Sequence, residues 1–262
     1  MPEIYREMRR HSYIELIWYK GTADLHAEAA RAYVGFIWWV LEPLLYMMAF
    51  YVAFGMGLRG PGGGVVALSL LCGLVPWKWF ASSVQNGSGI IQANSGLIMQ
   101  VYLPKYLLPG MVMVTNGIKF LIILGLLMLA MAAAHGVSVT WVALPVVVLV
   151  EMLLALALST LAAAIVPLLP DLDLVISNGL IVMMFMSGIF SDVDRLPPTL
   201  AHALALNPMV HVIRAFRTVL LEKHWPDWTA LGGVAAFSLV VYALALALMK
   251  HYDRIYPKLL VG

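Results

Sequence analysis

The sequence predicts an all-α membrane protein with six transmembrane helices, an N-terminal amphipathic interface helix and an outer re-entrant helical hairpin. Hydrophobic residues make up 62% of the 262 residues and charged residues only 11%, whereas a soluble domain carries about 25% charged residues. Lipid offers the backbone no hydrogen-bond partner, and the apolar runs lack the alternation of barrel strands, so helices are favoured. At roughly 20 residues per span, the length allows about six spans in a single membrane domain, 1–262, without a large soluble domain.

Residues 1–32 are expected to form a cytoplasmic amphipathic segment in two pieces. We place the break near Gly21, where Thr22 can cap a second helix that begins around Asp24. At about 100° per residue, the cationic side chains share one sector of the helix and the apolar side chains lie opposite. The cations are Arg6, Arg9, Arg10 and Lys20, and the apolar residues are Ile4, Met8, Ile14 and Trp18. Such a segment can rest on anionic headgroups and contact a cytosolic partner, or it can be a solvated helix without a further task.

The transmembrane region is expected to cover 36–249. Its first span runs from about 36 to 58, and a glycine-rich turn at 60–64 leads into the second, which begins near residue 65 and would form a helical hairpin with it. The polar stretch 85–89 begins the first cytoplasmic loop, which ends at Lys105. The third span follows from about 106 to 134.

A short outer turn at 135–140 precedes the fourth span, 141–169, and a cytoplasmic loop with Asp171 and Asp173 precedes the fifth, 174–190. Residues 191–230 contain two apolar runs that are too short to cross a bilayer, which predicts an outer re-entrant segment buried against protein. The last span is 231–249, and a cationic cytoplasmic tail, 250–262, follows it.

The distribution of lysine and arginine predicts cytoplasmic termini, because cytoplasmic flanks of spans are enriched in these residues. Nine lie on the side of the termini and five on the other: Arg6, Arg9, Arg10, Lys20, Arg31, Lys105, Lys250, Arg254 and Lys258 against Arg59, Arg195, Arg214, Arg217 and Lys223.

The sequence contains no motif for chemistry of its own. It has no G-x-x-x-x-G-K-[ST] loop for nucleotide phosphates and no G-x-S-x-G nucleophile motif. Its seven histidines never fall at ligand spacing on one helix turn, and Cys72 is the single cysteine. We therefore expect no catalytic residue, no metal site, no cofactor in this chain and ATP hydrolysis by another subunit. The net charge of +2 is scattered, which argues against nucleic-acid binding.

Ionisable residues inside the predicted spans are rare and usually paired or functional, because each costs about 2.5 to 3.5 kcal/mol at the bilayer centre. Four qualify: Glu42, Lys78, Lys119 and Glu151. The lysines can act directly or reach toward headgroups. Glu42 and Glu151 can pair with a neighbouring helix or line a polar path. The sequence does not choose between these roles.

Five motifs in chain order resemble the membrane subunits of ABC-type polysaccharide exporters, which handle capsule, O-antigen and teichoic-acid chains. They are residues 31–45, Pro76-Trp-Lys-Trp-Phe80, residues 97–105 with Pro109, Pro170-Asp-Leu-Asp173, and Asn207-Pro-Met209 followed by Arg214 and Arg217. The Pro-Asp-Leu-Asp loop departs from the arginine–aspartate pair often found there, so no role is assigned to its two aspartates.

The resemblance implies a homodimer that encloses a channel for a lipid-linked polysaccharide in the bacterial inner membrane. It also implies two copies of a nucleotide-binding ATPase on the cytoplasmic face and, for some members, periplasmic and outer-membrane partners. The N-terminal helix and first cytoplasmic loop would dock the ATPase, through Arg6, Arg10, Gln100 and Lys105. The outer re-entrant helices would act as a gate that includes Asn207, Arg214 and Arg217.

An aromatic stripe along the first span is the candidate substrate path. Its members fall within about 80° of one another, with Glu42 on the same span: Phe36, Trp39, Tyr46, Phe50 and Phe54. Flat apolar rings suit the C–H face of a sliding pyranose. The alternative is that the rings fill a helix interface, and Pro43 can twist the two halves of the span apart.

Two other functions fit the same architecture less well. A drug or lipid exporter of related design would have a smooth aliphatic interior and alternate its access. An integral-membrane transferase acting on lipid-linked sugars would need clustered acid–base groups at one face, and on the outer side only Asp192 and Asp194 form such a pair.

Overall fold

The computed structural model describes residues 17–27, 63–100, 104–190, 197–253 and 255–259, and single positions at 15, 37, 41, 42, 44, 45, 48 and 52. Within these residues the regular structure is entirely helical. Residues 17–27 form one helix, and the others in chain order are α3 (Gly63–Ser88), α4 (Ile90–Ala93), α5 (Ser95–Gln100), η2 (Lys105–Leu107), α6 (Leu108–His135), η3 (Val139–Ala143), α7 (Leu144–Ile165), α8 (Leu172–Phe185), α9 (Pro198–Ala205), α10 (Pro208–Arg217), η5 (Thr218–Glu222), α11 (Trp228–Tyr252) and α12 (Tyr256–Leu259).

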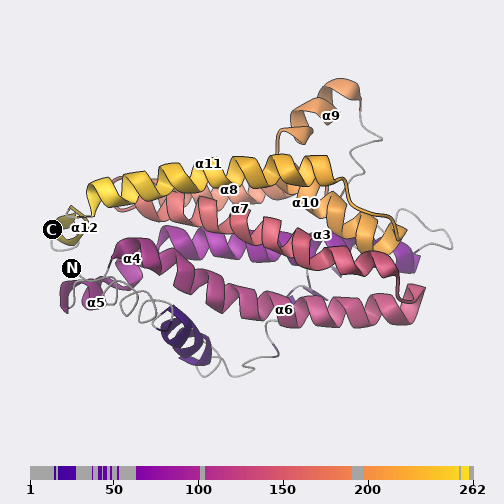
Figure 1. The fold of residues 1–262 in the computed structure, drawn as a ribbon, viewed down its shortest axis with the longest axis horizontal. Helices are drawn as coiled ribbons and strands as arrows, with labels where there is room; N and C mark the ends of the chain where they lie inside the picture. The colour runs from indigo at the N-terminus through magenta and orange to yellow at the C-terminus, as the bar shows by residue number, and fades with distance from the viewer. Residues whose placement is uncertain are drawn as a thin grey trace, which may run out of the picture.

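The long helices lie along one axis and form an elongated bundle (Figure 1). The short helices α4, α5 and α12 gather at one end of this bundle, which we call the α5 end. The short helix α10 and the connection between α6 and α7 lie at the opposite end, which we call the α10 end, and α9 projects away from the bundle there. The two ends therefore differ in the chain segments that they present.

Among the described residues, three helical segments are long and apolar enough to cross a membrane: Lys105–His135, Val139–Ile165 and Trp228–Tyr252. They correspond to the predicted third, fourth and last spans. The last of them is capped as the sequence rules favour, because the Asp227 carboxylate accepts hydrogen bonds from the backbone N–H groups of Thr229 and Ala230. A further bond from the Thr229 hydroxyl is the largest cause that lowers the pKa of Asp227 below its ordinary value.

The predicted fifth span is shorter than expected. Helix α8 has 14 residues, which makes it about 21 Å long at 1.5 Å per residue, less than the roughly 30 Å of a bilayer core. The helix ends because the chain turns after Phe185 and Gly188 adopts a left-handed φ of 72°. The first predicted span lies mostly outside the described residues, so the count of six spans stays a prediction.

The predicted break near Gly21 is wrong. Residues 17–27 are continuously helical, and the Thr22 hydroxyl donates to the carbonyl oxygens of Trp18 and Tyr19 one turn earlier, as an interior threonine does. Gly21 instead permits close packing, because a Cβ there would lie 2.9 Å from the Val114 side chain of α6. The small residue is therefore required by a contact between helices.

The polar stretch 85–89 is not a loop either. Helix α3 continues through Ser88, and its last turns pack tightly on α7. A Cβ at Gly87 would lie 2.0 Å from the Ser159 Oγ atom and 3.0 Å from the Ser159 Cα atom. The side chains of this stretch find polar partners on other helices, which allows the helix to extend further than its hydropathy suggests.

Two hydrophobic clusters hold the described helices together. The larger fills the centre of the bundle between α3, α6, α7 and α10. Trp79 stacks on Phe120 with ring centroids 4.1 Å apart, and Phe120 meets Phe216 edge-on. The smaller cluster lies at the α5 end and joins α4 and α5 to the ends of α6, α7 and α11. The α5 end thus has a core of its own.

Candidate functional site

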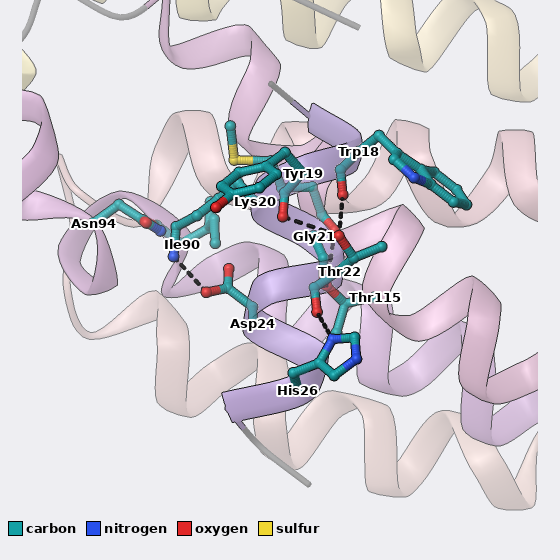
Figure 2. A network of polar contacts seen from close by, with 11 residues as sticks. Trp18, Tyr19, Lys20, Gly21, Thr22, Asp24, His26, Ile90, Asn94 and Thr115 are labelled. Atoms are coloured by element: carbon teal, nitrogen blue, oxygen red, sulfur yellow. Dashed lines mark hydrogen bonds and ion pairs between the residues drawn. The ribbon is translucent and has the colours of Figure 1, made fainter. Parts of the chain in front are cut away.

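At the α5 end, the helix 17–27 is fixed to α6. The Thr115 hydroxyl donates to the Gly21 carbonyl oxygen at 2.9 Å, and the Ile17 side chain would be 3.4 Å from a Cβ at Gly110. Figure 2 shows Thr115 beside Gly21. Trp18 and Tyr19 are exposed on this helix. The helix therefore presents aromatic side chains outward, while Ile17 and Gly21 pack on α6.

Lys105 is buried at the α5 end. Only 2% of its surface is exposed, and its Nζ atom lies 3.3 Å from the Asp253 Oδ1 atom, in the segment after α11. Gln100, at the end of α5, is exposed. Of the four predicted ATPase-coupling residues, then, Gln100 is available to a partner and Lys105 is held inside, while Arg6 and Arg10 lie outside the described residues.

The segment after α11 closes the same end. Tyr256 is fully buried, and its hydroxyl donates to the Ala164 carbonyl oxygen of α7 at 2.9 Å. Burial, reinforced by the negative charge of Asp253 and by Tyr252, raises the pKa of Tyr256 to about 12. The phenol therefore keeps its proton, and remains a hydrogen-bond donor, throughout the physiological pH range.

A polar network joins the end of α3 to the start of α8. The Asp173 Oδ1 atom accepts hydrogen bonds from the Ser88 hydroxyl and from the Gln85 amide, at 2.5 Å and 3.2 Å. The Ser177 hydroxyl donates to Gln85 Oε1 at 2.9 Å. Asp173, to which the sequence assigned no role, is thus the acceptor that ties α8 to α3.

A second branch of polar contacts joins α3 to α6. The Asn86 amide donates to Asn116 Oδ1 at 3.3 Å, and the Asn116 amide donates to the Ser83 hydroxyl at 3.4 Å. Asn116 is buried. Together with the Asp173 contacts, these bonds account for the polar character of residues 83–88.

Two of the four intramembrane ionisable residues are paired with each other. Lys78 Nζ lies 2.6 Å from Glu42 Oε1, which agrees with the pairing considered for Glu42, whereas for Lys78 the sequence had suggested a direct role or a headgroup contact. Glu151 is fully buried in α7, and among the described residues neither of its carboxylate oxygens has a hydrogen-bond partner. The Lys119 side chain is half-buried in α6, and its role stays open.

At the α10 end, Arg217 binds the backbone of two other segments. Its guanidinium donates to the carbonyl oxygens of Gly188 and Ile189, just after α8, and to that of Ser69 in α3. The first of these bonds measures 2.6 Å and the last 3.3 Å. Arg217 therefore fixes the end of α10 against both α3 and the turn that follows α8.

Asn207 makes a parallel connection. Its side-chain oxygen caps α10 by accepting from the Met209 backbone N–H at 3.0 Å, and its amide donates to the Met186 carbonyl oxygen and the Ser187 hydroxyl. Arg214 is exposed on the same helix. Two of the three predicted outer-gate residues thus hold α10 to residues 186–189, and the third is on the surface.

Comparison with known proteins decides the family. Residues 25–221 match the membrane domain described as ABC-2 type transporter. The chain belongs to this family. It is 32% identical over 246 residues to the O-antigen export system permease protein RfbA of Myxococcus xanthus, a match that covers 90% of this chain and 94% of the relative.

Other relatives of this ABC-2 transporter chain have related names. The O-antigen export system permease protein RfbA of Klebsiella pneumoniae is 23% identical, with 85% of this chain and 87% of the relative covered. The polysialic acid transport protein KpsM of Escherichia coli is 23% identical, with 88% and 91% covered. The resemblance inferred from the five motifs is confirmed.

The predicted substrate path falls almost wholly outside the described residues. This applies to Phe36, Trp39, Tyr46, Phe50 and Phe54, and equally to the aspartates considered for a transferase, Asp192 and Asp194. On the opposite face of the first span, Leu41 is half-buried and five other apolar side chains are exposed on the single chain: Ile37, Leu44, Leu45, Met48 and Val52. That face is free to contact lipid or another subunit.

Sequence reasoning missed the contributions of Asp173, Asn116, Asp253 and Tyr256. One signal was present in the tail, where Asp253 is the one acidic residue among the cations Lys250, Arg254 and Lys258. A single carboxylate in a cationic segment suggests that it pairs with one particular cation of the chain. Its identity, Lys105, required the fold.

Proposed function

We propose that this chain is the membrane subunit of an ABC exporter that moves a lipid-linked polysaccharide, such as an O-antigen or a capsular chain, across the bacterial inner membrane. The observation that carries this proposal is the match to an O-antigen export permease over 94% of that relative's length. A match of this extent covers 90% of the chain, and it fits a chain whose sequence contains no nucleotide-binding loop.

In this proposal the α5 end faces the cytoplasm and both termini lie there. The cationic flanks of the predicted spans support that orientation. The α5 end then offers the helix 17–27 and the pair α4–α5 to two copies of a separate ATPase, which binds ATP and magnesium. The proposal assigns no cofactor to this chain. Gln100, exposed at the end of α5, is placed to contact that partner.

The α10 end faces outward in the same proposal. Arg217 and Asn207 connect α10 to the turn after α8, so these segments would move together as one part of an outer gate. Arg214 is exposed on α10 and would face the emerging glycan or a periplasmic partner. Two copies of the chain would form a homodimer with the transport channel between them.

The aromatic stripe of the first span would line this channel and support sugar rings in many registers. Replacing Tyr46 and Phe50 together by leucine removes two rings and keeps most of the side-chain volume. Cells that lack the chain should accumulate the glycan in the cytoplasm, and the unchanged chain should restore export. The double variant should insert and bind the ATPase normally but restore export poorly.

Two outcomes would count against these proposals separately. If cells without the chain export the glycan normally, the proposed function is wrong. If the chain is required but the Tyr46→Leu, Phe50→Leu variant restores full export, the stripe is packing and the glycan path lies on other helices.

A further inference from the structure

The described residues that follow α11, Asp253 and 255–259, pack at the α5 end. Helix α12 lies beside the region of α4 and α5 in Figure 1, and it contacts α5. Tyr256, its first residue, is among the largest fully buried side chains of the protein. Its complete burial, outside the long helices, calls for a structural reason.

The buried tyrosine completes the smaller hydrophobic cluster. It packs with Ile91 of α4 and Ile98 of α5, and with residues from η2, the start of α6 and the ends of α7 and α11, namely Leu107, Leu108, Met111, Ala163, Ala164 and Met249. Ile17 of the helix 17–27 packs against the same cluster. The elements expected to receive the ATPase and the ends of three long helices therefore share one core.

Two directional contacts fix the segment in that core. The Asp253 carboxylate is paired with Lys105, which is buried, and the Tyr256 hydroxyl binds the last turn of α7. A buried charge that loses its partner is strongly destabilising. The pair consequently holds η2 against the end of α11, and the tyrosine holds the tail against α7.

We propose that the segment 253–259 is a coupling element, which locks the first cytoplasmic loop to α7 and α11 so that a displacement of that loop by the ATPase moves both helices. This proposal rests on the proposed function. It differs from docking, because Lys105 and Tyr256 are buried and act inside the chain. Loss of the contacts should leave the ATPase bound while its hydrolysis no longer drives export.

The test uses the full complex of this chain with its ATPase in proteoliposomes that contain the lipid-linked glycan. Export and ATP hydrolysis are measured together for Lys105→Met, Asp253→Asn, Tyr256→Phe and the exchange Lys105→Asp, Asp253→Lys. Lys250→Met is the matched control, because it removes a cation from the same end at an exposed position.

The glycan exported per ATP hydrolysed should fall by about two- to thirtyfold in Lys105→Met and Asp253→Asn, the range over which residues on a coupling route act. Tyr256→Phe should show a smaller fall, and the exchange should recover much of the ratio because it restores the pair. Lys250→Met should match the unchanged chain. Co-purification of the ATPase should be equal throughout.

Export per ATP that is unchanged in both Asp253→Asn and Tyr256→Phe would overturn the coupling role. It would also be overturned if export fell only in proportion to lost ATPase binding, which would indicate docking. If single variants fail to fold, the exchange variant decides, because normal folding without recovered coupling contradicts the proposal. Failure of the unchanged chain to export would instead refute the proposed function.

Discussion

Removal of the Arg217 side chain should destabilise the α10 end. Its guanidinium satisfies the carbonyl oxygens of Gly188 and Ile189, which are both buried. A buried polar group left without a partner costs about 1 to 3 kcal/mol. Arg217→Met leaves two such carbonyls and should lower the free energy of unfolding by about 2 to 6 kcal/mol.

Thermal unfolding of the purified chain in detergent measures this effect. For a chain of this size, 1 kcal/mol corresponds to about 2 to 4 °C, so Arg217→Met should lower the Tm by at least about 4 °C. Arg217→Lys keeps the charge and part of the bonding, and should fall between the variant and the unchanged chain. Arg214→Met is the control, because Arg214 is exposed on the same helix. Equal Tm values for Arg217→Met and Arg214→Met would refute the assigned role.

Two further variants test contacts between helices. Gly87→Ala places a Cβ against Ser159 of α7 and should destabilise the chain by about 1 to 3 kcal/mol through overpacking. Gly125→Ala is the control, because a Cβ there meets no atom within 4 Å. Equal Tm values for these two variants would show that α3 and α7 separate freely. For the Glu42–Lys78 pair, a double-mutant cycle with Glu42→Gln and Lys78→Met should give a coupling of about 0.5 to 3 kcal/mol, and additive effects would show that the pair contributes nothing.

The three most apolar spans were predictable because their signal is long and uninterrupted. The third span was expected from about 106 to 134 and the helical segment is Lys105–His135. The last was expected at 231–249 and is found at Trp228–Tyr252. In such runs hydropathy alone sets the position, and only the ends depend on capping residues such as Asp227.

The errors at Gly21 and at residues 85–89 have a common cause. Glycine and polar residues were interpreted by their local preference for turns, whereas here they serve contacts between helices that are distant in sequence. Gly21 admits Val114, and Gln85 and Ser88 bind Asp173. Tertiary packing overrides local propensity at such positions.

The candidate site was predictable as a set of regions but not as a set of partners. Asn207 and Arg217 were selected for an outer gate, and their actual partners are backbone atoms of residues that carry no motif. Lys105 was expected to meet another protein, and it is buried against Asp253. A backbone carbonyl or a single distant carboxylate leaves no pattern in one sequence.

The most direct test of polysaccharide export uses the purified chain in proteoliposomes loaded with its lipid-linked glycan. We expect that the chain alone hydrolyses no ATP, and that glycan reaches the opposite side of the membrane only when the separate ATPase and ATP are both present. Glycan transfer without the ATPase, or ATP hydrolysis by the chain alone, would contradict the assignment of this protein as the membrane subunit of an ATP-driven polysaccharide exporter.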